Sequence, residues 1–328
     1  MHLERRRHVR QACRRMVWLR YRIIFILSGL LVLWFPLNMV KSRNFTVGFR
    51  EAIDECEIFT RPAKMGEPGK LPVTHLSDML LKVDHVFVIG TDSCRMRFPR
   101  TFFGRATCVI GRQLDKCAPA SFIRGAYPHA MKVSFTHATV LYLAEKALYK
   151  HIAVLEDDVV IRQDVFSETL VHQFHSLLLT TGWSVIRFGY RPYFLEESSR
   201  EHCPSECRCK IREHISEQFC ELSPAGCDLR SSDFYVISAR YYESLSSTIL
   251  DLRQANSKRI IDTLPMRQLR RQWLILPQAS IQTTLDVPVD YQIGLSTLYV
   301  RKCVYPRPLS AAVTKQLFNS SLKSLIET

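Results

Sequence analysis

The 12 glycines of this 328-residue sequence form no glycine-rich loop of the kind that holds phosphate groups in P-loop proteins or in dinucleotide-binding folds. The usual kinase and dinucleotide-binding architectures are therefore excluded. Internal repeats and low-complexity stretches are also missing. The apolar fraction of 47% and the charged fraction of 23% are close to globular averages, which excludes a disordered, collagen-like or coiled-coil chain. A length of this order predicts one large globular domain or two ordinary ones.

The positive charge of the chain is concentrated at its N-terminus. Residues 1–22 contain eight arginines and one glutamate, so they carry +7 of the formal net charge of +14. The next 18 residues, 23–40, contain no charged side chain, and a membrane-spanning helix needs about 20 mostly apolar residues. A nucleic-acid-binding role is therefore disfavoured, because the basic block adjoins an apolar span.

A single transmembrane signal anchor at 23–40 is the preferred interpretation of this segment. A cleaved signal peptide is the alternative, but residues 38–42 offer no convincing small-residue cleavage site. Because the more basic flank stays on the cytosolic side, residues 1–22 are predicted to be a cytosolic tail. The body of the chain is then expected in the lumen of the Golgi apparatus or endoplasmic reticulum, as in single-pass type II membrane proteins.

The cysteines fit this oxidising location. Of 11 cysteines, one lies in the predicted cytosolic tail and ten follow the span, an even number that favours disulfides over a zinc site. Their pairing cannot be read from the sequence. Asn44 and Asn319 stand in glycosylation acceptor patterns.

The lumenal part divides by composition. Residues 41–82 mix proline, glycine and charge and are predicted to be a stem, whereas residues 83–305 form the domain and residues 306–328 a C-terminal tail. A cysteine-rich insertion at 196–227 interrupts the domain. Buried strands alternate with amphipathic helices, which predicts an α/β fold with a largely parallel sheet. The strands are expected at Val86–Ile89, Cys108–Gly111, Ile152–Leu155, Trp183–Phe188, Asp233–Ser238 and Trp273–Pro277, with helices from an N-cap near Ser134, over 164–180 and over 241–252.

Three adjacent acids, Glu156, Asp157 and Asp158, follow one of these strands. In open α/β sheets, ligands bind beyond the carboxyl ends of strands, and adjacent carboxylates repel one another unless a cation or hydrogen-bond donors offset them. A divalent metal that also holds a diphosphate meets this need. A solvated turn before a helix remains the other interpretation. His172 and His175 share a helix face, but without a third partner they are assigned to the surface.

The segment Val154–Val159 resembles the acidic motif of glycosyltransferase family 25, which contains the lipooligosaccharide β-galactosyltransferases and the collagen galactosyltransferases. Further short motifs follow in the order of that family, and together they span residues 84–282 without the cysteine-rich insertion. They are Val86–Ile89 followed by Arg95 and Arg97, Ser134–His137, Asp233–Arg240, Ile261-Asp262, and Pro277 with Gln278 and Gln282.

The resemblance implies a GT-A-like fold and a transferase that uses Mn²⁺ or another divalent cation with a UDP-sugar donor. It implies Asp158 and Glu156 as metal ligands, Asp262 as the base that takes the acceptor proton, and a nucleotide-sugar-binding set of Arg95, Arg97, His137, Glu156 and Asp157.

The sequence therefore predicts a hexosyltransferase that moves a sugar, with galactose as the first candidate, to a glycan or glycoprotein acceptor. The alternative is an inactive membrane-anchored ectodomain, lectin-like or receptor-like, that binds glycan or Ca²⁺. From the residues alone, each of these roles has an alternative. Asp262 can be a helix cap, Arg95 and Arg97 can be exposed loop residues, and His137 can be a hydrogen-bonded residue at a helix start.

Overall fold

The computed structural model divides into two units, Met1–Phe49 and Arg50–Thr328, and the second contains the fold. The structure describes residues 48–56, 60–65, 75–117, 127–162, 165–192, 209–211, 218–222, 229–230, 232–276 and 278–282. Within these residues no helix is both long and apolar enough to cross a bilayer. The predicted anchor at 23–40, Asn44, Asn319 and the tail at 306–328 all lie outside them.

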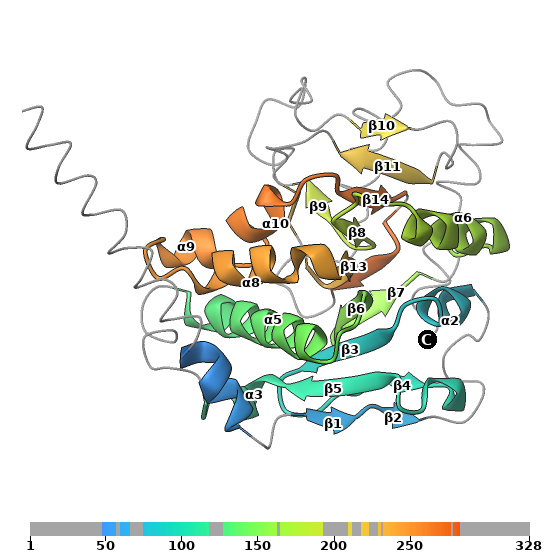
Figure 1. The fold of residues 1–328 in the computed structure, drawn as a ribbon. Helices are drawn as coiled ribbons and strands as arrows, with labels where there is room; N and C mark the ends of the chain where they lie inside the picture. The colour runs from blue at the N-terminus through green and yellow to red at the C-terminus, as the bar shows by residue number, and fades with distance from the viewer. Residues whose placement is uncertain are drawn as a thin grey trace, which may run out of the picture. The chain divides into compact units, whose positions relative to one another are not determined.

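A nine-stranded mixed sheet forms the centre of the second unit (Figure 1). Its strand order is β1-β5-β3-β6-β13-β8-β14-β11-β10. The bounds are β1 Thr60–Pro62, β5 Ala106–Ile110, β3 His85–Gly90, β6 His151–Glu156, β13 Phe234–Ser238, β8 Val185–Arg187, β14 Trp273–Ile275, β11 Phe219–Leu222 and β10 Cys209–Ile211.

The middle of this sheet is mainly parallel. Strand β3 pairs in parallel with β5 on one side and with β6 on the other, and β14 pairs in parallel with β8. Strand β13 lies between β6 and β8 and is antiparallel to both, so the two parallel groups run in the same direction. The predicted α/β class is confirmed, and all six expected strands exist. The direction of β13 is the feature that the sequence pattern did not reveal.

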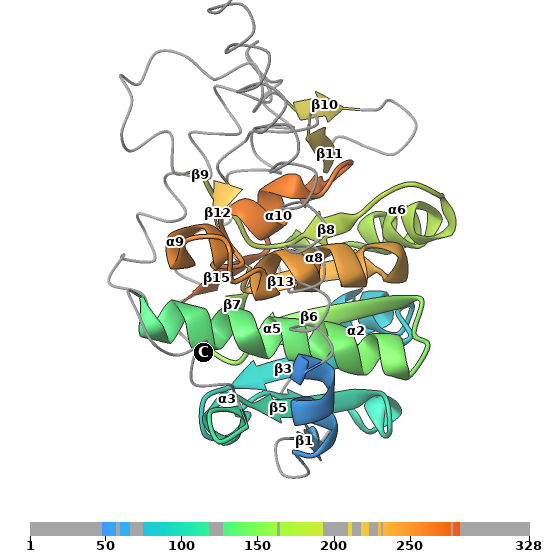
Figure 2. The same ribbon diagram turned by 60° about the vertical axis from the view of Figure 1, so that its left-hand side comes forward.

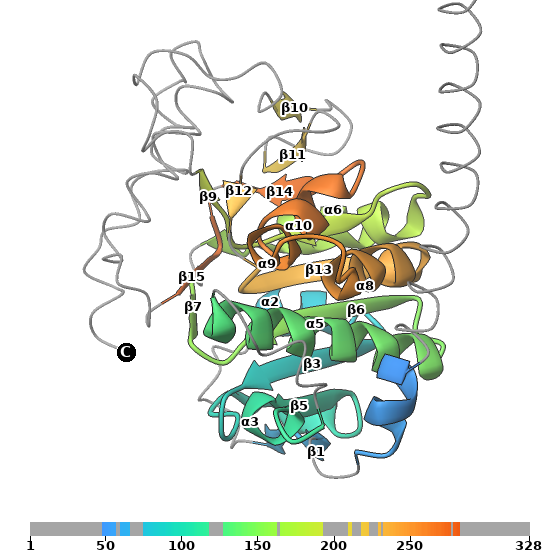
Figure 3. The same cartoon turned by 90° about the vertical axis from the view of Figure 1, so that its left-hand side faces the viewer.

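Helices cover both faces of the sheet. Strand side chains alternate between faces, and Val86 and Val88 of β3 share an apolar cluster with α2 (His75–Leu80) and α6 (Glu168–Leu179). The opposite face is covered by α5 (Pro128–Lys146) and α8 (Tyr242–Leu250), which lie side by side (Figures 2 and 3). Helix α6 begins at Ser167, whose side chain accepts a hydrogen bond from the Leu170 N–H, as an N-cap does.

Helix α5 begins earlier than the sequence predicted. Pro128 occupies the first turn, where its missing N–H and fixed φ suit a helix start. Ser134 is therefore an interior residue and not the N-cap, and its hydroxyl donates to the carbonyl oxygen of Ala130 at 2.8 Å. The same hydroxyl oxygen accepts from the Ile261 N–H at 2.9 Å, which ties the segment before α10 (Leu264–Gln268) to α5.

The folded domain also reaches further toward the N-terminus than the predicted stem allows. Strand β1, inside the expected 41–82 stem, is antiparallel to β5 at the edge of the main sheet. Helix α2 buries Leu76, Met79 and Leu80 in the core. A composition rich in proline and charge therefore concealed two strands, β1 and β2 (Lys64–Met65), and helix α2 of the domain.

The described parts of the cysteine-rich insertion extend the other edge of the sheet. Strand β10 pairs with β11, and β11 pairs with β14, both antiparallel. Cys220 on β11 is disulfide-bonded. Two further disulfides, Cys56–Cys117 and Cys94–Cys108, join described residues, which confirms the prediction of disulfides for these cysteines.

His85 makes the stability of this domain depend on pH. Its ring is buried, stacks on Tyr149 at 4.8 Å, and places Nε2 2.8 Å from the Thr107 hydroxyl. Burial, together with the nearby charge of Arg105, lowers the pKa of His85 from 6.5 to about 4. The folded state thus keeps this ring neutral under conditions in which the unfolded chain binds a proton.

The stabilisation is present above pH 6.5 and is lost as the pH falls toward 4. We expect the free energy of unfolding to be about 2 kcal/mol lower at about pH 5 than at about pH 7 from this residue alone. Urea titrations at the two pH values measure the difference, and His85→Gln, which does not titrate, should reduce it. An unchanged pH dependence in that variant would contradict the assignment.

Candidate functional site

A cavity of about 570 Å³ opens at the carboxyl ends of β3, β5 and β6. The chain leaves β3 toward β5 on one side, while β6 lies on the other side of β3. Ligands of α/β proteins bind where the direction of winding changes in this way. The walls come from residues 89–93 after β3, the start of α3 (Gly111–Leu114) after β5, one side of α5, and the acids after β6.

Two glycines lie at the strand ends beside this cavity, and one of them, Gly90, is sterically required. A Cβ atom on Gly90 would lie 2.4 Å from the Ser93 carbonyl oxygen, so only glycine permits the tight turn after β3. At Gly111 a Cβ atom would already be 3.5 Å from both the Gly90 carbonyl oxygen and the Thr136 hydroxyl. These isolated glycines carry no phosphate-loop pattern, and sequence analysis therefore did not assign them.

Asp157 organises the loop that follows β3. Its carboxylate accepts from the Arg95 N–H at 2.7 Å to each oxygen and from the Met96 N–H at 2.8 Å. Its own N–H donates to the Ile89 carbonyl oxygen at 2.8 Å. Burial raises the pKa of the Asp157 carboxyl, against the opposing effect of these N–H donors. Asp157 lines the cavity, and its hydrogen bonds hold in place the loop after β3, which forms part of the cavity wall.

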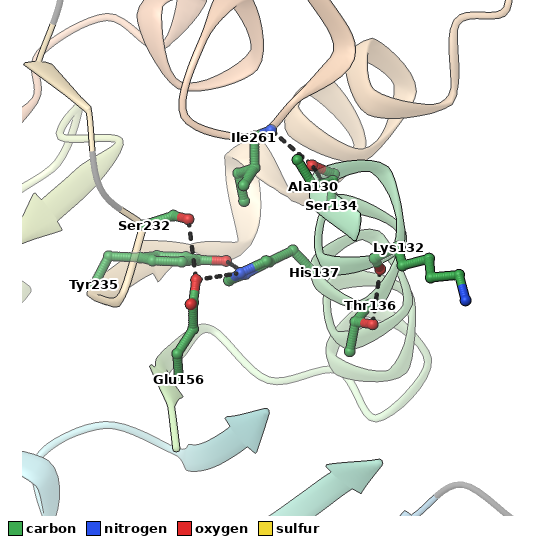
Figure 4. Close-up of polar contacts among 9 residues, drawn as sticks. All are labelled: Ala130, Lys132, Ser134, Thr136, His137, Glu156, Ser232, Tyr235 and Ile261. Carbon is green, nitrogen blue, oxygen red and sulfur yellow. Dashed lines mark hydrogen bonds and ion pairs between the residues drawn. The ribbon is translucent and has the colours of Figure 1, made fainter. Parts of the chain in front are cut away.

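Glu156 points into a polar network inside the domain (Figure 4). Its Oε1 lies 3.2 Å from Nε2 of His137 and accepts from the Ser232 hydroxyl at 3.3 Å. The other ring nitrogen of His137, Nδ1, lies 2.9 Å from the Tyr235 hydroxyl. His137 is fully buried, so its predicted contact with substrate is replaced by hydrogen bonds that orient Glu156 at the cavity wall.

Asp158 completes the acidic segment, and its side chain lines the cavity. The structure thus brings Glu156, Asp157 and Asp158 to one cavity, as predicted. In the described part of the chain, no group of three histidine, cysteine, aspartate or glutamate side chains is arranged to hold a metal ion. Metals that bind nucleotides commonly use one or two carboxylates and complete their coordination with substrate phosphates. The acids fit that kind of site and do not form an all-protein cage.

Cationic side chains line the same cavity as these acids. Arg95 lines it, as predicted, whereas Arg97 lies on β4 (Arg97–Phe98), is exposed, and is not among the described residues that line it. Two further cations were missed. Arg112 pairs with Asp92 at 2.8 Å and Lys132 with Asp115 at 2.5 Å. Their positions depend on α3 and α5 meeting at the strand ends, which no motif in the sequence signals.

Asp262 lies beside the same network. Burial is the main cause that raises the pKa of the Tyr235 hydroxyl. The nearby Glu156, Tyr242 and Asp262 raise this pKa further. Oδ1 of Asp262 is buried and has no hydrogen-bond partner among the residues that the structure describes. The helix α10 that follows has Thr263 as its N-cap, without a side-chain cap bond. The alternative of Asp262 as a helix cap therefore finds no support. Asp262 is not among the described residues that line the cavity.

The structure adds a third histidine to the pair that the sequence placed on one helix face. His75 of α2 lines a second cavity, of about 310 Å³, together with His172 and His175 of α6. His172 is exposed and lies 4.0 Å from Glu168. Among the described residues, no group of three such side chains is arranged to hold a metal ion. The exposure of His172 agrees with the surface assignment.

No protein-family model and no curated protein matches this chain. Among solved structures, it is similar to mannose-1-phosphate geranyltransferase from Thermus thermophilus, with 12% identity, a TM-score of 0.26, and coverage of 60% of this chain and 75% of that chain. A likeness of this size carries no argument about the function of the present chain.

Proposed function

We propose that this chain is a divalent-metal-dependent glycosyltransferase that takes its sugar from a UDP-sugar. One observation carries the proposal: the acids Glu156, Asp157 and Asp158 line a cavity at the winding switch of the parallel strands, and Arg95 lines the same cavity. A nucleotide diphosphate needs both kinds of group, cations for its oxygens and carboxylates for its metal and sugar hydroxyls. The resemblance to family 25 motifs supports the same chemistry.

The donor diphosphate is assigned to Arg95 and the metal. Arg95 has its N–H held by Asp157, so the loop that carries its guanidinium is fixed before substrate binds. Because this loop is already ordered, Arg95 loses less conformational entropy when it binds the diphosphate, which favours tight binding. Arg97, exposed on β4, keeps its predicted diphosphate role only as a proposal.

Mn²⁺ is assigned to Asp158, with Glu156 as the second carboxylate. When bound, such an ion offsets the charge that grows on the departing diphosphate. The protein's own contribution is orientation: His137 and Ser232 hold Oε1 of Glu156, and Asp157 holds the neighbouring loop. Both contacts restrict side chains that would otherwise repel one another.

Asp262 is assigned as the base. In an inverting transfer the acceptor hydroxyl loses its proton as its oxygen bonds to the sugar carbon and the bond from that carbon to the diphosphate breaks. The buried Oδ1 of Asp262 is an acceptor without a partner in the described region, and Ser134 fixes the backbone next to it through the Ile261 N–H. The proton is therefore assigned to Oδ1.

The location and substrates follow from the sequence. We assign the chain to the Golgi apparatus or endoplasmic reticulum as a single-pass type II membrane protein, glycosylated at Asn44 and Asn319. Its transferred sugar is proposed to be a hexose such as galactose, and its acceptor a glycan or glycoprotein. The disulfides Cys94–Cys108 and Cys56–Cys117 are consistent with an oxidising lumen.

Nucleotide binding tests the proposal. We expect full-length protein to bind UDP and to turn over at least one UDP-sugar only with Mn²⁺ or a similar ion, and Asp158→Asn to weaken UDP binding at least tenfold. Isothermal titration with UDP and a panel of UDP-sugars with and without Mn²⁺ give both values. Glu243→Gln, an exposed acid on α8 outside the cavity, is the matched control.

Two outcomes would reverse this conclusion. Absence of nucleotide binding with any ion, in a protein with a normal melting curve, would reject the transferase. Glycan or Ca²⁺ binding that UDP does not affect would favour the inactive lectin-like ectodomain instead.

A further inference from the structure

The amino ends of the parallel strands, opposite the cavity, form a surface with exposed apolar and basic side chains. This surface is called the edge. Because β3, β5, β6 and β8 run in the same direction, the turns that lead into them lie together at the far edge from their carboxyl ends. Strand β13 runs the other way and ends at this edge. Figure 2 shows β3 and α5 lengthwise, so both ends of each can be followed in that view.

The three most exposed large apolar side chains of the described residues lie in these turns. Phe103, in the turn into β5, is 82% exposed, Leu148, in the turn into β6, is 87% exposed, and Leu179, before β8, is 75% exposed. Each of the three precedes a different strand. Strands in a sheet are about 4.8 Å apart, and β5, β6 and β8 are each separated by one intervening strand. The strands that they precede are therefore roughly 10 Å apart along the sheet. Leu148 follows α5 and Leu179 ends α6, and these two helices cover opposite faces of the sheet.

Leu148 is held in a conformation that leucine disfavours. Its φ is 59°, in the left-handed region, directly after α5 ends. The turn is fixed by hydrogen bonds from the Leu148 N–H to the Glu145 carbonyl and from the Tyr149 N–H to the Ala144 carbonyl, a helix ending in which glycine is the usual residue. A leucine at this position adds exposed apolar surface and backbone strain, so folding alone does not explain it.

Hydrogen bonds join these turns into one continuous surface. The Arg105 guanidinium donates to the Leu81 and Val83 carbonyls, and the Asp84 carboxylate accepts from the N–H groups of Lys150 and His151. The chain of contacts continues from the Ala239 N–H to the Lys150 carbonyl and from the Ser238 N–H to the Ser184 carbonyl. The turns consequently form a rigid edge.

This edge is strongly basic. The segments 81–84, 100–105, 146–151, 179–184 and 239–241 contain six lysines and arginines and one aspartate, a net charge of 6 − 1 = +5, or +4 when Asp54, which binds Lys146, is included. Lys82, Arg100, Lys150 and Arg240 are exposed among them. A second copy of the same edge would be repelled by this charge, whereas an anionic surface would be attracted.

We propose that this edge, defined by Phe103, Leu148 and Leu179 and the basic residues between them, docks on an anionic lipid bilayer. Separate apolar side chains enter the headgroup region while the surrounding lysines and arginines bind lipid phosphates. The bilayer then contacts the edge opposite the cavity, so the cavity faces away from the membrane. The inference does not depend on the reaction proposed above, but it requires anionic lipid in the membrane leaflet that the domain faces.

The test places a fluorescent probe at the edge. Full-length protein carrying Leu148→Trp, and separately Phe103→Trp, is reconstituted from detergent into vesicles of phosphatidylcholine mixed with phosphatidylserine. Vesicles of phosphatidylcholine alone are the lipid control, and brominated lipid serves as the quencher. The matched variant is Tyr127→Trp, because Tyr127 lies at the other end of α5, is 59% exposed and also has a positive φ of 63°. Wild-type emission is subtracted to remove the native tryptophans.

We expect brominated lipid to quench the probes at 148 and 103 at least twofold more than the probe at 127, and the difference to fall when phosphatidylserine is omitted. Equal quenching at 148 and 127 would overturn the proposal. A blue-shifted probe at 148 that brominated lipid does not quench would also overturn it, because the edge would then bind protein. Leu148→Gly is expected to keep or raise the melting temperature, and a lower one would show that the leucine serves folding.

Discussion

Replacing Asp157 by alanine is expected to lower the free energy of unfolding by about 2–4 kcal/mol, because two backbone N–H groups lose their acceptor. The Arg95 and Met96 N–H groups both donate to this carboxylate, at 2.7 to 2.8 Å. The loop they belong to carries Arg95 into the cavity. UDP binding should therefore weaken together with stability, although Asp157 is assigned no direct contact with the metal.

Two matched variants separate this role from a loss of charge. Asp157→Asn keeps one oxygen acceptor and should retain part of the stability, whereas Asp92→Ala removes another carboxylate from the same cavity and should cost less than about 1 kcal/mol, because its pair with Arg112 is exposed. Chemical denaturation of the three variants gives the comparison. If Asp157→Ala unfolded at the same denaturant concentration as Asp92→Ala, the loop would not depend on Asp157.

Removing either described disulfide is expected to have an effect of similar size. The chain-entropy model relates the loss of stability to loop length, giving about 3 kcal/mol for Cys94–Cys108 and about 4 kcal/mol for Cys56–Cys117, whose cysteines are separated by 14 and 61 residues. The two should differ in their effect on binding. Cys94 stands next to Arg95 and is tied to β5, so only its loss should also disturb the cavity.

Double serine variants test the predicted losses of stability and the predicted difference in UDP affinity. Cys94→Ser with Cys108→Ser should lower both the melting temperature and UDP affinity, whereas Cys56→Ser with Cys117→Ser should lower the melting temperature while UDP affinity changes less than threefold. Equal losses of affinity in the two variants would contradict the assignment of Cys94–Cys108 to the cavity.

Asp157 and Cys94 act on the same short segment, so their effects should not add. Once the disulfide has been removed, the loop at 93–96 is already loosened, and Asp157→Ala then has less order to destroy. Interactions of this kind appear as a coupling free energy in a double-mutant cycle, because residues that share one structural unit are not independent.

Much of the fold was predictable because burial imposes local patterns. Strand β3 is buried at all six positions, and its apolar run is visible in the sequence. Helix α6 was predicted from its apolar face, although the predicted start at 164 precedes the first helical residue, Glu168. The acids after β6 were recognised for a similar reason, since a run of three carboxylates at a strand end has few explanations. Helix α5 was misplaced at its start because a serine inside a helix can bond its own backbone, as Ser134 does.

By itself the sequence determined that the chain is α/β and that an acidic segment ends a buried strand, because each depends on residues adjacent in the chain. The even number of cysteines after the predicted anchor indicated disulfides, and the structure shows them for Cys56, Cys94, Cys108, Cys117 and Cys220. Only the tertiary structure decided what each acid does. Glu156 meets His137, 19 residues away, and Asp157 meets the Arg95 N–H, 62 residues away. The antiparallel direction of β13 and the gathering of Phe103, Leu148 and Leu179 at one edge depend on strand order, which local patterns do not encode.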